Sequence, residues 1–195
     1  MIRAVIFDFA GVIGTDGYWV WLRKQIPNLA EKEAGQKDFQ HLSDEVDSGK
    51  ISNSTYLKKL AKLTGVNPET IWPEIFKNVV INTELVSILG KLKQKYKVGL
   101  LSNYTHEWLE HLLRAHHLNL YFDDIVISSK IKTLKPHWEI FQRSLNNLGV
   151  SAQEAVFIDD RQIHVDAANK VGIRGVLYTT NEILKKDLES FGVKV

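Results

Sequence analysis

The stretch from Ile2 to Ile13 reads IRAVIFDFAGVI, and it carries one acidic side chain, Asp8, out of an apolar run. Residues 4–7 are strand formers, and Gly11 lets the backbone turn away sharply after Asp8. Buried strands of parallel sheets have this composition, and open α/β sheets bind ligands at the carboxyl ends of their strands. The stretch therefore favours a buried strand that delivers Asp8 to a ligand crevice. An aspartate that only caps a turn is the alternative.

Four later segments repeat the pattern of a short, apolar, β-branched run. They are residues 98–101, 124–128, 155–158 and 175–178. Apolar residues at helical spacing separate them, in residues 82–95, 106–117, 137–148 and 164–171. This alternation predicts an α/β fold with a Rossmann-like, doubly wound parallel sheet and right-handed crossovers.

The exception is a stretch of about sixty residues, from Trp19 to roughly Val80, that has no strand signal. It contains four apolar stripes at helical spacing, the third made of Tyr56, Leu57, Leu60 and Leu63. Breaks fall at Pro27-Asn28, at residues 47–50, at residues 65–68 and at Pro73. We expect a small α-helical cap at residues 17–80, inserted into a core of residues 1–16 and 81–195.

The position of this insertion directly after Asp8 favours a lid over the site, with an additional layer of the core as the alternative. Trp19 and Trp21 follow the Asp8 turn closely, so one of them is a candidate for the pocket wall.

Composition excludes several classes of function. The 195 residues carry 25 Lys+Arg against 23 Asp+Glu, so the net charge of +2 gives no reason to expect a nucleic acid or membrane partner. The absence of cysteine excludes disulfides, thiolate nucleophiles and Cys-ligated zinc. No run approaches the 18 or so apolar residues that span a bilayer. We expect a cytoplasmic protein, monomeric or homodimeric, whose partner is a small molecule.

Polar side chains follow other predicted strands. Ser102 and Asn103 come after the second strand, where a hydroxyl and backbone N–H groups can bind an anionic oxygen or cap a helix. Lys135 precedes Pro136, which can begin a helix. A lysine held at that helix entrance could neutralise a phosphate or a carboxylate, whereas an ordinary lysine would face solvent.

Two consecutive acids, Asp159 and Asp160, end the fourth predicted strand. Adjacent carboxylates repel each other unless a cation compensates, and Mg²⁺ is a common partner for such oxygen ligands. One acid could simply cap a helix. Two acids, together with Asp8 on another strand end, favour a metal site.

The order of these motifs resembles the haloacid dehalogenase-like hydrolases, in the subclass with a helical cap between the first and second motifs (subclass I). Asp8-Phe9-Ala10-Gly11-Val12 looks like the first motif, Ser102 the second, Lys135 the third and Asp159-Asp160 the fourth. Three details are similar to the branch of sugar-phosphate phosphatases and the N-terminal phosphatase domains of epoxide hydrolases. They are the ending Asp159-Asp160-Arg161, the pair Gly11-Val12 and the turn Ser48 to Ser52.

The resemblance implies an enzyme in which Asp8 attacks phosphorus and forms an aspartyl-phosphate. It implies Mg²⁺ held by Asp8, Asp160 and the backbone carbonyl of Ala10, with Asp159 beside them or on a metal-bound water. It implies a phosphoryl group bound by Ser102, Asn103, Gly11 and Lys135. The family often has a further acid four positions beyond its metal ligand, where this chain has His164.

The main departure from the family pattern is Ala10, since phosphatases of the family usually have a second aspartate there as general acid and base. The absence of that second aspartate predicts a slow enzyme, a leaving group that needs no proton, or a replacement acid. The candidates for a replacement acid are His106, Thr15 and Tyr18. Three functions stay open. They are a Mg²⁺-dependent phosphatase of a small phosphorylated metabolite, a phosphonate hydrolase that uses a cap lysine (Lys24, Lys50 or Lys58), and a module that binds a phosphorylated ligand without turnover.

Overall fold

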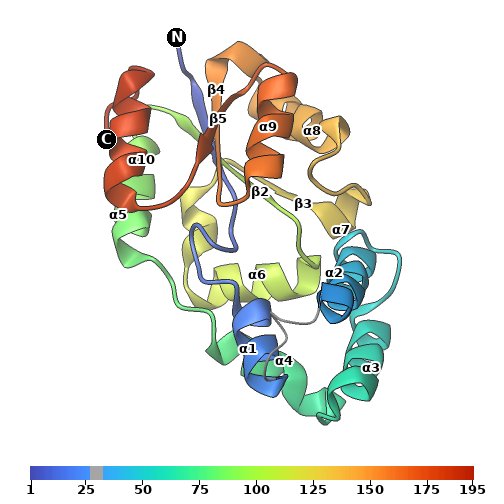
Figure 1. Ribbon diagram of the computed structural model, residues 1–195. Helices are drawn as coiled ribbons and strands as arrows, with labels where there is room; N and C mark the ends of the chain where they lie inside the picture. The colour runs from blue at the N-terminus through green and yellow to red at the C-terminus, as the bar shows by residue number, and fades with distance from the viewer. Residues whose placement is uncertain (27–32) are drawn as a thin grey trace.

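The computed structural model describes residues 1–26 and 33–195, and the predicted break at Pro27-Asn28 lies outside the described residues. Strands and helices alternate along most of the chain (Figure 1). The strands are β1 (Ala4–Phe7), β2 (Lys97–Ser102), β3 (Asp124–Ile127), β4 (Ala155–Asp159) and β5 (Arg174–Leu177). The helices outside the insertion are α5 (Thr83–Leu92), α6 (His106–Ala115), α7 (Ser128–Ile131), α8 (Trp138–Leu148), α9 (Gln162–Lys170) and α10 (Asn181–Ser190). The described residues also contain the short 3₁₀ turns η2 (Leu118–Tyr121) and η3 (Ala152–Glu154).

The five strands form one parallel sheet in the order β3-β2-β1-β4-β5. Strand β1 lies at its centre, with Phe7 in register with Leu100 of β2 and with Ile158 of β4. The predicted α/β fold with a parallel sheet is thereby confirmed. Because parallel strands end at the same edge, the residues that follow β1, β2 and β4 meet there.

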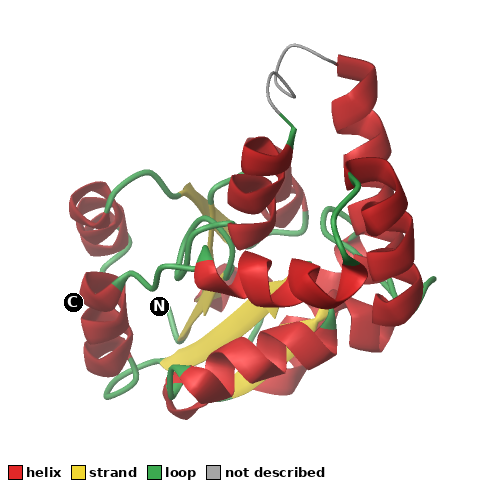
Figure 2. Ribbon diagram, turned by 90° about the horizontal axis from the view of Figure 1, so that it is seen from below, coloured by secondary structure: helices red, strands yellow, loops and turns green. Residues whose placement is uncertain are grey.

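Both faces of the sheet are covered, as the apolar character of β1 requires. Val5 and Phe7 pack in a cluster with residues of α5, α6 and α10, whereas Ala4 and Ile6 pack in a second cluster with residues of α8 and α9. Successive side chains of a strand point to opposite faces, so one four-residue segment anchors both layers. Figure 2, coloured by secondary structure, shows helices lying alongside the strands of the sheet.

The predicted strand and helix boundaries differ from the observed ones by a few residues. The helix predicted at residues 82–95 ends at Leu92, and after β3 Ser128 belongs to the helix α7 and not to the strand. The helix predicted at residues 137–148 begins at Trp138, and Pro136 is not its first residue. The backbone N–H of His137 donates to the carbonyl of Leu134 at 2.9 Å, so Pro136 lies inside a tight turn before the helix.

The insertion after β1 consists of helices in its described part. They are α1 (Gly17–Gln25), α2 (Glu33–Asp47), α3 (Asn53–Thr64) and α4 (Pro68–Lys77). They enclose their own apolar cluster, which includes Trp21, Leu42, Leu60 and Ile75. The cluster supports the proposal that residues 17–80 form a separate cap, and the boundaries of that cap stay a prediction.

Among its described residues, the insertion contacts the rest of the molecule at several places, including its connecting segments, α6 and α7. Its two connecting segments lie side by side, since Thr15 N–H donates to the Val80 carbonyl at 3.0 Å and Asn82 N–H to the Ile13 carbonyl at 2.9 Å. On the other side, Trp72 of α4 stacks on Trp108 of α6 with the ring centroids 4.3 Å apart. In the part of the chain that the structure describes, no helix has the length and apolar character needed to cross a membrane.

Helix α3 offers a matched test of the insertion's interior. Leu60 is fully buried, whereas Leu63, predicted in the same stripe, is 52% exposed. We expect Leu60→Ala to lower the free energy of unfolding by about 2–5 kcal/mol, since it leaves a cavity. Leu63→Ala should change it by roughly 0.5 kcal/mol or less. Urea denaturation measures both, and equal losses would contradict the packing described above.

Candidate active site

Asp8 is the first residue after β1 and lies almost fully buried at the carboxyl edge of the sheet. Its backbone N–H donates to the carbonyl of Ile158 in β4 at 2.9 Å, which continues the pairing of the two strands. One carboxylate oxygen, Oδ1, accepts the N–H of Phe9 at 2.7 Å and lies 3.0 Å from Lys135 Nζ. The side chain of Asp8 is therefore held in one orientation.

Lys135 joins two acids inside the protein. Its Nζ lies 3.0 Å from Asp8 Oδ1 and 2.6 Å from Asp159 Oδ2, and its side chain is completely buried. Burial alone would lower the pKa of this ammonium, but the two carboxylates outweigh burial and raise it. Lys135 is therefore a fixed positive charge at the strand ends, as a residue that neutralises an anion should be.

Asp159, the last residue of β4, holds that lysine in place. Its carboxylate also contacts His164 Nδ1 of α9, at 3.1 and 3.0 Å, and accepts the Arg161 N–H at 2.9 Å. Burial would raise the pKa of Asp159, but the charge of Lys135 and the hydrogen bond from His164 bring it down to about 2. With both oxygens engaged, Asp159 is suited to positioning Lys135.

Asp160 is the most open of the three acids and forms no salt bridge among the described residues. Partial burial and the negative charges of Asp8 and Asp159 raise its pKa to about 7. Its carboxylate lies where a side chain at Gly11 would be, because a Cβ there would approach Asp160 Oδ2 to 2.1 Å. Gly11 has a φ of +81°, so both the turn and the approach of Asp160 favour glycine.

The three acids meet the chemical requirements of a metal site. Each of Asp8, Asp159 and Asp160 offers a carboxylate oxygen, and these oxygens lie within 4.8 Å of one another. Oxygen donors of this kind suit a hard divalent cation such as Mg²⁺. Repulsion among the carboxylates would fall once a cation lay between them.

Ser102 and Asn103 follow β2 at the same edge of the sheet. The Ser102 hydroxyl is fully buried and has no hydrogen-bond partner within the described residues, although buried hydroxyls are ordinarily paired. The hydroxyl lies beside the Asp8 carboxyl, where it opposes the rise in the pKa of Asp8 that burial causes, and it is available to an anionic ligand at that place. The side-chain amide of Asn103 binds the Lys135 backbone twice, accepting its N–H at 2.8 Å and donating to its carbonyl at 3.0 Å.

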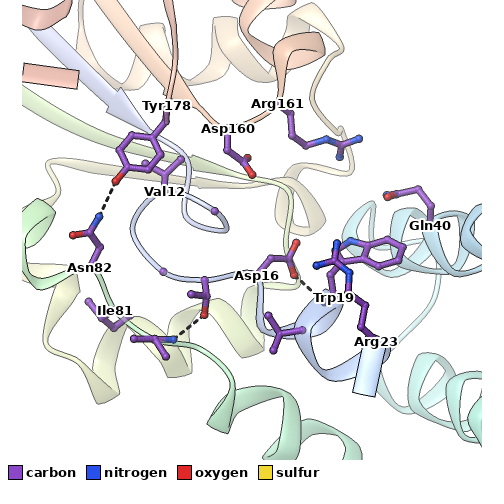
Figure 3. Close-up of a pocket in the computed structure, with 15 residues that line it drawn as sticks. Val12, Asp16, Trp19, Arg23, Gln40, Ile81, Asn82, Asp160, Arg161 and Tyr178 are labelled. Carbon is purple, nitrogen blue, oxygen red and sulfur yellow. Dashed lines mark hydrogen bonds between the residues drawn. The ribbon is translucent and has the colours of Figure 1, made fainter. Parts of the chain in front are cut away.

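Two cavities adjoin these residues. A small one, of about 100 Å³, lies between the strand ends and the insertion, and its wall includes Asp8, Ala10 and Asp47. A larger one, of about 800 Å³, extends from Gly11 and Asp160 along helix α1. Figure 3 shows the larger cavity with Asp160, Arg161 and Tyr178 on one side. Trp19, Arg23 and Gln40 of the insertion lie on the other side.

The three candidates for a replacement acid, Thr15, His106 and Tyr18, lie in different surroundings. Thr15 uses its hydroxyl at the connection to the insertion, where it donates to the Asn78 carbonyl at 2.6 Å. His106 begins α6, with its Nε2 3.7 Å from Glu107, and lines neither cavity. Tyr18 lines the small cavity and donates to the Phe39 carbonyl at 3.3 Å. Burial raises the pKa of Tyr18 well above its ordinary value, which makes it a poorer acid.

The sequence analysis did not single out three acids of the cavity walls, Asp16, Asp44 and Asp47. Asp16 accepts the Trp19 N–H at 3.2 Å and caps α1, a signal that the sequence Asp16-Gly17 could have provided. Asp47 ends α2, and the sequence indicated only a helix break there. Of the lysines suspected in the insertion, Lys24, Lys50 and Lys58 are exposed and are not among the described residues that line the two cavities.

Comparison with known proteins places this arrangement in a family. A family model described as haloacid dehalogenase-like hydrolase matches residues 5–178. Over 186 residues the chain is 27% identical to the D-ribitol-5-phosphate phosphatase of Bacteroides thetaiotaomicron, a match that covers 88% of this chain and 89% of that protein.

Solved structures show the same fold. A HAD family enzyme from Bacteroides thetaiotaomicron superposes with a TM-score of 0.80 at 22% identity, covering 96% of this chain and 98% of that one. A crystal structure of that enzyme in complex with magnesium and inorganic phosphate superposes with a TM-score of 0.75 at 23% identity, covering 93% and 96%.

Gly11 gives a direct test of the geometry around Asp160. We expect Gly11→Ala to displace the Asp160 carboxylate and to weaken the stabilisation of the protein by Mg²⁺, measured as the shift of the melting temperature with added MgCl₂. Gly65→Ala is the matched control, since Gly65 has a similar φ of +74° but nothing within 4 Å of its Cβ position. Equal Mg²⁺ shifts in wild type, Gly11→Ala and Gly65→Ala would contradict this assignment.

Proposed function

This chain belongs to the haloacid dehalogenase-like hydrolases, and we propose that it is a Mg²⁺-dependent phosphatase of a small phosphorylated metabolite. The reaction proceeds through an aspartyl-phosphate on Asp8. One observation carries the proposal. The buried ammonium of Lys135 lies between Asp8 and Asp159, at the strand end that also presents Asp160 and the unpaired hydroxyl of Ser102.

Asp8 is arranged as a nucleophile. Its Oδ1 accepts the Phe9 N–H and contacts Lys135, whereas no hydrogen bond to Oδ2 is found among the described residues. We assign the attack on phosphorus to Oδ2. Attack by a carboxylate divides one difficult displacement into two easier ones, the formation and the hydrolysis of the acyl phosphate.

The phosphoryl oxygens require positive charge and hydrogen-bond donors as the reaction proceeds. Lys135 supplies a charge that cannot move away, since Asp159 holds its Nζ and Asn103 holds its backbone. Ser102 supplies a hydroxyl donor. Donors fixed in advance stabilise the charge of the transition state without reorganisation at the moment of reaction.

Asp8, Asp160 and the carbonyl of Ala10 would hold Mg²⁺, with Asp159 beside them. When bound, the ion would neutralise the phosphate and orient it toward Asp8. The magnesium and phosphate complex of the structural neighbour supports this choice of metal.

The larger cavity supports a substrate of the size of a sugar phosphate. Its volume of about 800 Å³ lies within the usual range for small-molecule sites. Gln40, Asn82, Arg23 and Arg161 bring polar groups to its wall, which suits a ligand rich in hydroxyls. The D-ribitol-5-phosphate phosphatase among the relatives supports the same class of substrate.

The exposed positions of Lys24, Lys50 and Lys58, outside the cavity walls, do not support a lysine adduct as in phosphonate hydrolysis. Phosphate monoesters are therefore the class of substrate that we propose.

We expect the purified chain to release phosphate from p-nitrophenyl phosphate and from ribitol 5-phosphate when Mg²⁺ is present. Asp8→Asn should abolish release, because it removes the nucleophile, and EDTA should abolish it until Mg²⁺ is restored. Asp166→Asn, at an exposed position, is the control that should stay active. A malachite green assay measures the phosphate.

Release that persists in Asp8→Asn would contradict the nucleophile assignment. If nothing is hydrolysed but sugar phosphates raise the melting temperature, the chain is a binding module and not a phosphatase.

A further inference from the structure

The proposed function leaves one chemical requirement without a residue. A sugar alkoxide is a poor leaving group unless it receives a proton, and the water that later attacks the acyl phosphate must lose one. Ala10 has no transferable proton, and Lys135 is committed to Asp8 and Asp159. The inference that follows rests on the proposed function and concerns the source of that proton.

Several titratable groups line the small cavity, and most of them are otherwise engaged. His164 contacts the Asp159 carboxylate through Nδ1, Asp160 belongs to the proposed metal site, and Asp44 accepts the side-chain amide of Gln40 at 2.8 Å. Burial raises the pKa of Tyr18, Tyr56 and Tyr104 above the ordinary value, so these phenols are poor acids at neutral pH. The Asp16 carboxylate is engaged as the cap of α1. Asp47, at the end of α2, faces the same cavity as Asp8 and Ala10.

The backbone of Asp47 is fixed against the rest of the molecule. Its carbonyl accepts the Ser128 hydroxyl at 2.6 Å, and the same hydroxyl oxygen accepts the Tyr104 N–H at 3.0 Å. Gly49 lies so close to the Ser129 carbonyl that a Cβ would approach it to 2.8 Å. The end of α2 is thus docked on α7, whose Ser128 also binds the loop that follows Ser102, and this places Asp47 in the wall of the cavity that Asp8 lines.

The surroundings of the Asp47 carboxyl favour its protonated form. It accepts the Ser43 hydroxyl at 3.2 Å, and no lysine or arginine lies within 4.0 Å of it among the described residues. Burial, opposed by that hydrogen bond, and the charges of Asp16, Asp44 and Asp8 raise the pKa of Asp47 to about 8. The side chain nonetheless keeps part of its surface open to the cavity.

We propose that Asp47 is the general acid and base of the reaction, in place of a residue beside Asp8. When Asp8 attacks phosphorus, the bond to the leaving oxygen breaks and that oxygen takes the proton of the Asp47 carboxyl, so the alcohol departs neutral. The Asp47 carboxylate then takes a proton from the water that attacks the acyl phosphate. Phosphate leaves, Asp8 is again a carboxylate and Asp47 again carries a proton.

The test compares two substrates in the first turnover of the full chain with Mg²⁺. Ribitol 5-phosphate needs a proton on its leaving oxygen, whereas p-nitrophenolate leaves without one. We expect Asp47→Asn to slow the first turnover of ribitol 5-phosphate by about 10²–10⁴-fold. The first-turnover burst of p-nitrophenol should stay close to the wild-type burst, followed by a slower steady state. Asp38→Asn, an exposed acid on the same helix, is the control and should match wild type for both substrates.

Equal losses for both substrates in the first turnover, or no loss for either, would overturn the role of Asp47. If wild type itself releases no phosphate from either substrate, the proposed function is wrong and this role fails with it. A failure of the Asp47 assignment alone would leave Asp8-dependent release intact, so the two failures are distinguishable.

A measurement without turnover checks the protonation of Asp47. A carboxyl whose pKa is higher in the folded than in the unfolded state stabilises the fold less as the pH rises from about 4 to about 8. The titratable groups around it are Asp8, Asp16, Asp44, Tyr18, Tyr56 and Tyr104. In metal-free buffer, we expect the melting temperature of Asp47→Asn minus that of wild type to increase as the pH rises from 5 to 8. A constant difference would mean that Asp47 is already ionised, and would overturn the proposal.

Discussion

The contact of Lys135 with Asp8 and Asp159 is the interaction on which the rest of the site depends. Two carboxylates side by side in a protein interior are costly unless a cation lies between them, so the lysine makes the close approach of β1 and β4 compatible with acids at their ends. With Asp160, three carboxylates and one ammonium leave a formal charge of −2. A single divalent cation would cancel that charge, so the arrangement is suited to a metal ion.

The site is built from two parts of the chain with different tasks. The sheet fixes the groups to which we assign the binding of phosphate, the attack on phosphorus and the positioning of Lys135, since Asp8, Ser102 and Asp159 are each at or next to the end of a strand. The insertion supplies the walls that surround a substrate, with Trp19, Arg23 and Gln40 on one side of the larger cavity. The insertion has an apolar cluster of its own, apart from the clusters that cover the sheet, so we expect exchanges of its cavity-wall residues to alter the substrate more than the groups at the strand ends.

The sequence predicted the parallel sheet and the residues at its strand ends, because short apolar runs followed by Asp8, Ser102 or Asp159 carry that information locally. It did not predict how the residues between strands are used. Pro136 is a residue typical of the start of a helix. The backbone of its neighbour Lys135 is held instead by hydrogen bonds to the side chain of Asn103, 32 residues away in sequence. The same holds for Asp47, since only the docking of α2 on Ser128 turns an ordinary helix end toward Asp8. Contacts between distant segments decide both positions, and no local pattern encodes them.

The stacked pair of Trp72 and Trp108 has a consequence for observing this molecule. One indole belongs to the insertion and the other to α6, with the rings 4.3 Å apart and only 9° from parallel. Indoles in such contact couple their excited states, so any separation of the insertion from the sheet would alter the intrinsic fluorescence and the near-ultraviolet circular dichroism. The two tryptophans therefore report on the contact between the insertion and the sheet without an added fluorescent label.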